Sequence, residues 1–156
     1  MQENYYLRKV KEKDIEAVFN LFNEDYVRDN SINKSKITWE DHVKWFRSVI
    51  NSTDNIFFVV TDYQDQFLGQ IRYKVENHSA IVSIGLCQEI RGKGLAKKLL
   101  MDSIKLIAEE NDGVNNVIAY ILEQNVASQK VFEQVDFVLS ENQRGLLKYI
   151  YKITRE

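Results

Sequence analysis

Apolar residues recur along this chain with two different periods, every third or fourth residue in some stretches and in short continuous runs in others. Helical spacing predicts amphipathic helices from residue 13 to about residue 26, over 39–50 and over 95–110. A shorter helix begins at Asn125 or Ser128 and runs through Val135. Runs rich in β-branched and aromatic residues predict strands at 5–10, 56–60, 67–76, 80–88, 117–122, 137–139 and 147–153. The order β-α-α-β-β-β-α-β-α-β-β predicts an α/β fold with helices on both faces of a mixed sheet.

Polar residues mark where these elements begin and end. Asp14 and Thr38 are predicted helix N-caps, because a short side-chain oxygen can accept a hydrogen bond from a free backbone N–H. The polar segment 28–31 ends the first helix. Turns at 63–66 and 77–79 connect three strands into an antiparallel meander.

Composition narrows the class of protein. A chain of 156 residues, 44% hydrophobic and 28% charged, is most simply one soluble domain spanning 1–156. A net charge of −2 argues against a general nucleic-acid binder, and no apolar run approaches the roughly 20 residues that span a bilayer. The single cysteine, Cys87, excludes an intramolecular disulfide, and residues 1–4 lack the apolar core of a signal peptide. We therefore expect a cytoplasmic protein that acts on neither membranes nor nucleic acids.

The candidate chemistry lies where the strand 80–88 runs into a glycine-rich turn and then into the helix 95–110. That turn reads Arg91-Gly92-Lys93-Gly94-Leu95-Ala96. The first backbone N–H groups of a helix have no partner within it, and the helix dipole adds partial positive charge at the same point. Glycines let phosphate oxygens approach this backbone, and Arg91 and Lys93 add cationic charge. The turn is therefore predicted to bind a pyrophosphate.

The strand before the turn has two unlike faces. Ala80, Val82, Ile84 and Leu86 share an apolar face, which is predicted to be core. The opposite face carries smaller or more polar residues, namely Ile81, Ser83, Gly85 and Cys87. Either a ligand lies along this second face, or its small residues make room for a neighbouring side chain.

Two motifs together carry a family resemblance. Arg91, Gly94 and Ala96 match the pattern Gln/Arg-x-x-Gly-x-Gly/Ala, and about 30 residues later a segment from Asn125 to Phe137 matches a second signature. With the element order, they make the whole chain resemble the GNAT superfamily of acetyl-CoA-dependent N-acetyltransferases. The resemblance implies a single-domain GNAT fold with a mixed, mostly antiparallel sheet.

The resemblance implies acetyl-CoA as the acetyl donor and no metal ion. The turn would hold the pyrophosphate through its backbone N–H groups, and Leu86 and Cys87 would pair with the pantetheine arm. The N–H near Leu86 would stabilise the oxyanion that develops on the thioester. Lys97, Lys98 and Lys130 either approach the 3′-phosphate or form an ordinary solvated helix face. The cofactor-binding residues implied are Leu86, Cys87, Arg91, Gly92, Lys93, Gly94, Leu95, Ala96, Asn125, Ser128, Lys130 and Phe132.

The sequence indicates the catalytic acid and base less clearly than it indicates the cofactor-binding residues. Many family members carry a tyrosine that protonates the leaving thiolate where this chain has Phe132, which has no proton to give. Tyr120 could relay or donate a proton. Glu76, His78 and Glu89 flank the third meander strand and are further candidates. Direct attack by the amine fits the family better than acylation of Cys87, so we expect Tyr120 and the Leu86 N–H to act in catalysis.

The N-terminal third is similar to the branch of the superfamily that acetylates nucleotide-linked amino sugars, as in pseudaminic acid biosynthesis. The shared residues are His42, Trp45 and Phe46 on one helix and the Ala119-Tyr120 pair on a later strand.

In that interpretation one aromatic side chain stacks on a sugar or uracil ring, while polar groups bond hydroxyls or phosphate. The substrate-binding residues would be Asn30, His42, Trp45 and Ser83, with Arg28 beside them. Two other functions stay open: a protein N-terminal acetyltransferase, and a non-catalytic CoA-binding regulatory module. The resemblance also allows a homodimer.

Overall fold

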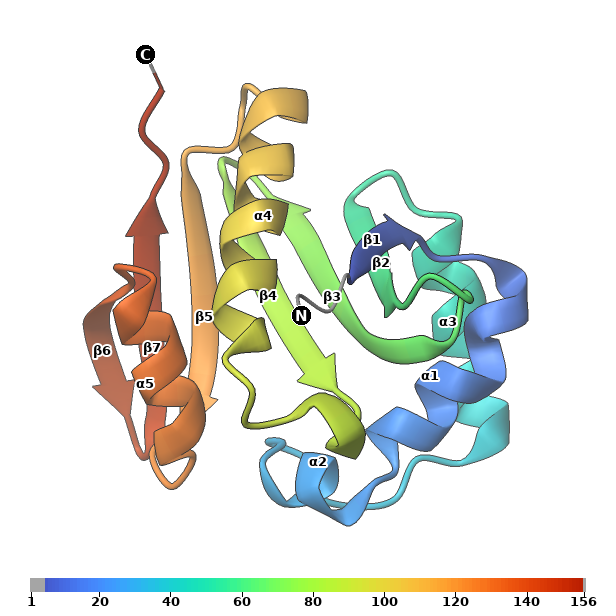
Figure 1. The fold of residues 1–156 in the computed structure, drawn as a ribbon. Helices are drawn as coiled ribbons and strands as arrows, with labels where there is room; N and C mark the ends of the chain where they lie inside the picture. Colours follow the sequence, from blue (N-terminus) through green and yellow to red (C-terminus); the bar gives the residue numbers. More distant parts are fainter. Residues whose placement is uncertain (1–4, 156) are drawn as a thin grey trace.

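Seven strands form one mixed sheet in the computed structural model, which describes residues 5–155 (Figure 1). The strand order is β1-β2-β3-β4-β5-β7-β6, and every neighbouring pair is antiparallel except β4 and β5. The strands are β1 (Tyr6–Lys9), β2 (Asn55–Thr61), β3 (Phe67–Glu76), β4 (Ser79–Leu86), β5 (Asn116–Leu122), β6 (Val138–Gln143) and β7 (Leu146–Lys152).

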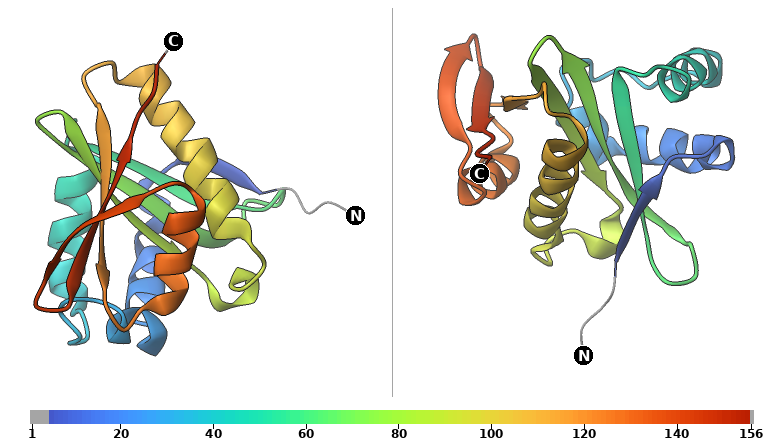
Figure 2. Two further views of the ribbon diagram at one scale, coloured as in Figure 1. Left: turned by 90° about the vertical axis from the view of Figure 1, so that its left-hand side faces the viewer. Right: turned by 90° about the horizontal axis from the view of Figure 1, so that it is seen from above.

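Helices cover both faces of this sheet (Figure 2). One face carries α4 (Leu95–Glu110) and α5 (Val126–Gln134), and the other carries α1 (Ile15–Phe22) and α3 (Trp39–Ile50). The short helix α2 (Asp25–Asp29) lies between α1 and α3 in the chain. Two 3₁₀ turns, Glu12–Asp14 and Gln88–Ile90, precede α1 and α4. No helix in the described part of the chain is long and apolar enough to cross a membrane.

The main core lies between the sheet and α4. Leu100, Ile104 and Ile107 form the buried stripe of α4, as their helical spacing predicts. Tyr73 of β3 points to the same side, where its hydroxyl lies 2.6 Å from the hydroxyl of Ser103. Successive residues of a strand face opposite sides of the sheet, so the neighbours of Tyr73 on β3 face α1 and α3.

The parallel pair β4 and β5 is the feature that positions the site. Only three residues of each strand are paired, from Ser79 opposite Asn116 to Ile81 opposite Ile118. Beyond Ile81 the two strands diverge, and Figure 1 shows their carboxyl ends well apart. Backbone groups on the facing edges of these ends are therefore not used in the sheet.

The long helices match the sequence prediction. The bounds of α3 and α4 are those expected, and the Thr38 hydroxyl caps α3 by accepting a hydrogen bond from the Asp41 N–H at 3.2 Å. The expected strand at 137–139 begins one residue later and continues to Gln143 as β6.

The prediction for the first helix and its surroundings is wrong in three respects. The helix stops at Phe22 rather than near Tyr26, because the Asn23 side chain pairs with both backbone groups of Ile37 at 2.7 and 2.9 Å. Residues 28 and 29, expected as a polar loop, belong to α2. Asp14 also does not cap α1 through its side chain.

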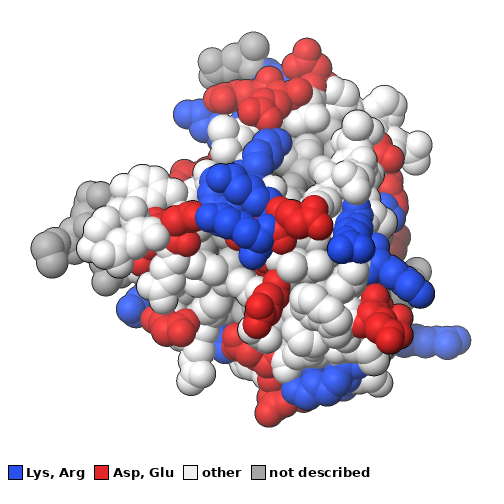
Figure 3. Space-filling view, turned by 90° about the vertical axis from the view of Figure 1, so that its right-hand side faces the viewer, with Lys and Arg blue, Asp and Glu red and all other residues white. Residues whose placement is uncertain are grey.

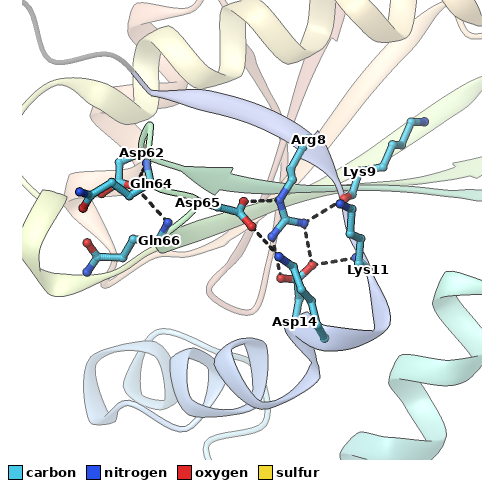
Figure 4. Close-up of polar contacts among 9 residues, drawn as sticks. Arg8, Lys9, Lys11, Asp14, Asp62, Gln64, Asp65 and Gln66 are labelled. Carbon is cyan, nitrogen blue, oxygen red and sulfur yellow. Dashed lines mark hydrogen bonds and ion pairs between the residues drawn. The ribbon is translucent and has the colours of Figure 1, made fainter.

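Asp14 instead belongs to an ion-pair cluster that fastens β1 to the start of α1 (Figure 4). Its buried carboxylate accepts two hydrogen bonds of 2.8 Å from Arg8 and one of 2.7 Å from the Lys11 N–H. Arg8 also donates to Asp65 of the β2–β3 turn at 2.7 Å, and Lys13 pairs with the same carboxylate. Acidic and basic side chains are interspersed over the neighbouring surface (Figure 3).

Asp136 ends α5 with a left-handed residue, φ 69°. The N–H of Asp136 donates to Glu133 at 3.1 Å and that of Phe137 to Phe132 at 3.0 Å, which is a Schellman motif. Glycine is the usual residue at this position, so aspartate introduces local backbone strain.

Candidate active site

A cleft of about 740 Å³ opens where β4 and β5 diverge. Residues of the glycine turn and α5 line one part of it, and residues of α1, α2 and α3 line the other. We call these parts the turn side and the helix side. The volume is typical of a small-molecule site.

On the turn side the backbone is shaped to receive an anion. Gly92 and Gly94 both have φ of 75°, and nothing lies within 4 Å of the position that a Cβ would take at either residue. Gly94 is the N-cap of α4 and supplies no side-chain hydrogen bond, so the first N–H groups of this 16-residue helix need another partner. No acidic residue lies in the first turn of α4. This backbone fits the pyrophosphate expected from the sequence.

The edge of β4 presents a backbone donor to the cleft. The Cys87 N–H donates to the Leu68 carbonyl of β3 at 2.8 Å. Because successive N–H groups of a strand point to opposite edges, the Leu86 N–H points away from β3, toward the gap. The Leu86 carbonyl confirms this direction, because it accepts a hydrogen bond from the Arg91 side chain at 2.8 Å. An N–H at this place can stabilise a developing oxyanion.

Arg91 is directed toward α2 rather than toward the expected pyrophosphate. One of its terminal nitrogens lies 2.6 Å from a Glu24 carboxylate oxygen, and its guanidinium lies 4.4 Å from the centre of the Tyr26 ring. With the bond to Leu86, these contacts use the Nε and Nη2 groups of the guanidinium. The positive charge expected from Arg91 at the turn is therefore neutralised by Glu24, while Lys93 remains exposed there.

The second signature motif holds α5 against the cleft. The Asn125 side chain caps α5 by accepting from the Ser128 N–H at 3.2 Å. Phe132 is buried and packs edge-to-face on Phe137, with ring centres 4.9 Å apart. Asn125, Ser128 and Phe132 line the cleft, whereas Lys130 is exposed outside it.

The helix side gathers all the residues expected to bind the acceptor. Asn30, His42, Trp45 and Ser83 line the cleft, and Tyr120 faces them from β5. His42 is only 1% exposed, and its Nε2 lies 2.8 Å from the Ile15 carbonyl, which can only accept.

Burial lowers the pKa of His42 and keeps its imidazole neutral. It packs against the rings of Phe19, Phe22, Trp39, Trp45 and Phe46. Its Nε2 is thus occupied in joining α3 to α1, and is not available to bond a substrate hydroxyl.

The other candidates for acid, base or nucleophile lie away from the cleft lining. Glu76 is the last residue of β3, and His78 lies in the β3–β4 turn, where its Nδ1 is 3.0 Å from the Gly113 carbonyl. Glu89 is exposed in the turn before α4. Burial, reinforced by Glu89 and Glu24, raises the pKa of Cys87 to about 11, which disfavours the thiolate a nucleophile needs.

Two residues of β3 that the sequence interpretation did not single out form the floor of the helix side. Arg72 and Gln70 face the cleft opposite Ser83 and Gly85 of β4. The Arg72 guanidinium lies 4.8 Å from the centre of the Trp45 ring. The sequence carried a signal for them, because these polar residues alternate with apolar ones within a strand.

The segment between α1 and α3 forms part of the wall of the helix side. Arg91 bonds Glu24 at its start, and Gln124 of the β5–α5 loop donates to the Asp29 carbonyl at 2.8 Å. Arg28 fixes the segment internally through the carbonyls of Phe22, Asn33 and Ser35. Within residues 5–155 no cluster of three or more His, Cys, Asp or Glu could hold a metal ion.

Comparisons with known proteins agree with this geometry. Residues 4–138 match the acetyltransferase (GNAT) domain family. YwnH of Bacillus subtilis (strain 168), provisionally named a phosphinothricin acetyltransferase, is 28% identical over 138 residues, which cover 84% of this chain and 82% of YwnH.

Solved structures share the fold. The Vibrio cholerae spermidine N-acetyltransferase in complex with CoA and spermine has a TM-score of 0.83 at 17% identity, covering 95% of each chain. A domain from Methanocaldococcus jannaschii DSM 2661 has a TM-score of 0.85 at 18% identity, covering 97% of this chain and all of that one. The chain thus belongs to the GNAT acetyltransferase family and is an acetyl-CoA-dependent N-acetyltransferase.

Proposed function

We propose that this enzyme acetylates the primary amine of a small molecule by direct attack on the thioester of acetyl-CoA. The observation that carries the proposal is the divergence of β4 and β5 beyond Ile81, which leaves strand edges free between the glycine turn and the helix side. The pantetheine arm lies between the strands, with its pyrophosphate on the N–H groups of residues 92–96. The acetyl group then lies near Leu86.

The chain's own groups assist the transfer in two ways. The Leu86 N–H stabilises the oxyanion as the amine adds to the carbonyl. Tyr120, on the opposite wall, relays a proton between the reacting centre and solvent. Phe132 supplies no proton, so CoA leaves as a thiolate that is protonated by water.

The contacts Arg91–Glu24 and Gln124–Asp29 hold residues 24–29 against the glycine turn and the β5–α5 loop. A cleft of about 740 Å³ with this wall held in place suits a small acceptor. A nucleotide-linked amino sugar is one acceptor of this kind, and its ring could lie against Trp45. The names of relatives point to other amines, phosphinothricin for YwnH and spermidine for the Vibrio cholerae enzyme.

An acceptor panel tests the proposal. Thiol release from acetyl-CoA is measured with phosphinothricin, spermidine, a UDP-linked 4-amino sugar and a short peptide with a free N-terminus. The proposal predicts release with at least one small amine and an acetylated product in its mass spectrum. Release with the peptide alone would contradict the small-molecule acceptor, and CoA binding without release from any amine would indicate a non-catalytic module.

A further inference from the structure

The guanidinium of Arg72 has no polar partner in the described part of the chain. It lies over the rings of Trp45 and Phe57, 4.8 and 5.9 Å from their centres. Neither a hydrogen bond nor an ion pair joins it to another residue within 5–155. Its five N–H donors are left to the cleft that Arg72 lines.

The other half-buried arginines show how this protein treats a guanidinium that has only a structural role. Arg8 is bonded to Asp14 and Asp65, and Arg91 to Glu24 and the Leu86 carbonyl. Arg28 donates to three backbone carbonyls. The nitrogens of Arg72 are not among the fully buried unsatisfied atoms, so its donors are open to the cleft and available to a ligand.

The surroundings of Arg72 favour a negatively charged ligand. The charged residues lining the cleft are Arg28, Arg72, Arg91 and Asp41. Arg28 and Arg91 are occupied, and Asp41 is exposed in the first turn of α3. Burial lowers the pKa of Arg72 to about 10, so it still carries its charge at neutral pH. A planar guanidinium is well suited to hold a carboxylate, phosphinate or phosphate through two parallel bonds.

Gln70, on the same wall of the cleft, has an acceptor without a partner among the described residues, which calls for a hydrogen-bond donor on the ligand in addition to the anion. It lies two residues before Arg72 on the same face of β3 and is 1% exposed, and its Oε1 finds no hydrogen-bond partner within 5–155. Gln70 is opposite Gly85, next to Leu86, whereas Arg72 is opposite Ser83. Ser83 is three residues from Leu86, about 10 Å along the strand. The Arg72 guanidinium lies over Phe57, its partner on β2, so the acceptor must extend from Leu86 past Gln70 to reach it.

We propose that Arg72 binds an oxyanion of the acceptor, so that the enzyme selects amines that also carry a carboxylate, phosphinate or phosphate group. Gln70 lies between this anion and the acetyl group. Trp45 holds the guanidinium in place by stacking on it. The inference rests on the proposed function, because it assigns the helix side to the acceptor.

The first test compares each acceptor that is turned over with its neutral ester or amide, in wild type, Arg72→Met, Arg72→Lys and Arg47→Met. For the anionic form, Arg72→Met lowers kcat/KM by about 30-fold or more, because a buried charge loses its partner. For the neutral form the change stays below about threefold. Arg72→Lys retains more activity than Arg72→Met, and the exposed Arg47 serves as the matched control. Equal losses for both forms, or spermidine as the best acceptor, would overturn the inference while leaving the acetyltransferase intact.

A second test does not depend on turnover. The protein is saturated with CoA, so that the glycine turn is occupied, and inorganic phosphate is titrated while its phosphorus resonance is followed. Wild type and Arg47→Met broaden the resonance, and Arg72→Met does not, with thermal unfolding confirming that each variant is folded. Absence of broadening in wild type, or its persistence in Arg72→Met, would overturn the inference. Broadening lost with Arg72, combined with no thiol release from any amine, would leave the anion site standing and contradict the proposed function instead.

Discussion

Arg91 and Glu24 form an ion pair of 2.6 Å between two segments that are 67 residues apart in the chain. Arg91 opens the glycine turn that we assign to the cofactor pyrophosphate, and Glu24 begins the segment that lines the helix side. Both side chains are mostly buried, so the pair is less exposed to screening than a surface ion pair. The Arg91–Glu24 ion pair therefore connects the turn side of the cleft to the helix side. Arg91 is also a residue of the family motif.

Replacing Glu24 by Gln is expected to loosen the segment 24–37 without disturbing the cofactor. Amide hydrogen exchange in this segment becomes faster, and KM for the amine rises by about three- to tenfold, equivalent to roughly 1 kcal/mol. The dissociation constant for CoA changes less than about twofold, since the turn binds through its backbone. A variant that loses CoA affinity with an unchanged segment 24–37 would assign Arg91 to the cofactor instead.

His42 makes stability depend on pH. Burial holds the pKa of the folded imidazole below its unfolded value of about 6.5, so the unfolded chain binds a proton first as the pH falls. The stabilisation from the neutral ring is complete above pH 6.5 and is lost as the pH decreases below it. Urea unfolding at pH 8 and pH 5.5 measures this difference. His42→Gln should reduce it, and an unchanged difference in His42→Gln would contradict the assignment to His42.

Asp14 is expected to be the most sensitive member of the ion-pair cluster. Burial alone would raise the pKa of its carboxyl group, but the hydrogen bonds from Arg8 and the Lys11 N–H outweigh burial and lower it. Asp14→Asn leaves Arg8 with a missing partner and should reduce the free energy of unfolding by about 2–4 kcal/mol.

The contribution of Asp14 is present above the ordinary carboxyl pKa of about 3.9 and disappears as the pH falls through the lower folded value. Asp65→Asn is the control, because Asp65 bonds the same arginine from an exposed turn and should matter less. Chemical denaturation at pH 7 compares the two variants. An equal or larger loss for Asp65→Asn would contradict the ranking.

Cys87 should react slowly with thiol reagents. Its pKa of about 11 leaves little thiolate at neutral pH. The rate of alkylation by iodoacetamide should therefore rise with pH without reaching a plateau below pH 10. A plateau near pH 8 would show an activated thiol and reopen transfer through an acetylated cysteine.

The helices illustrate what the sequence could and could not predict. The periodicity of 95–110 and the Thr38 cap define α4 and α3 correctly, since both signals are local. The apolar spacing of the first helix continues to Tyr26, but the helix ends at Phe22 because Asn23 bonds Ile37, 14 residues away. The local spacing of apolar residues cannot predict a contact between residues that far apart in the chain.

Some features of the candidate site could likewise be predicted from the sequence, and others could not. The motifs correctly place Gly94 and Asn125 at the starts of α4 and α5, because they encode local backbone geometry. The contacts of these residues and of Leu86 with acetyl-CoA stay predictions. Arg91 matches the family motif, yet its side chain is directed to Glu24, and no local signal indicates this. The alternation of polar and apolar residues in β3 marks Arg72 as a candidate, but only the structure shows that it lacks a polar partner within residues 5–155, unlike the other half-buried arginines.

Calorimetric titration of acetyl-CoA into wild type, Gly94→Val and Gly113→Ala tests the central claim most directly. Gly94 has φ of 75°, which a β-branched residue adopts only under strain, and its side chain would extend into the space assigned to the pyrophosphate. Gly113 has open space around it at the far end of α4 and is the matched control. The account predicts at least about a tenfold weaker affinity for Gly94→Val, equivalent to 1.4 kcal/mol, and unchanged affinity for Gly113→Ala. Equal affinity of Gly94→Val and wild type, with both proteins folded, would contradict the assignment of this turn to acetyl-CoA.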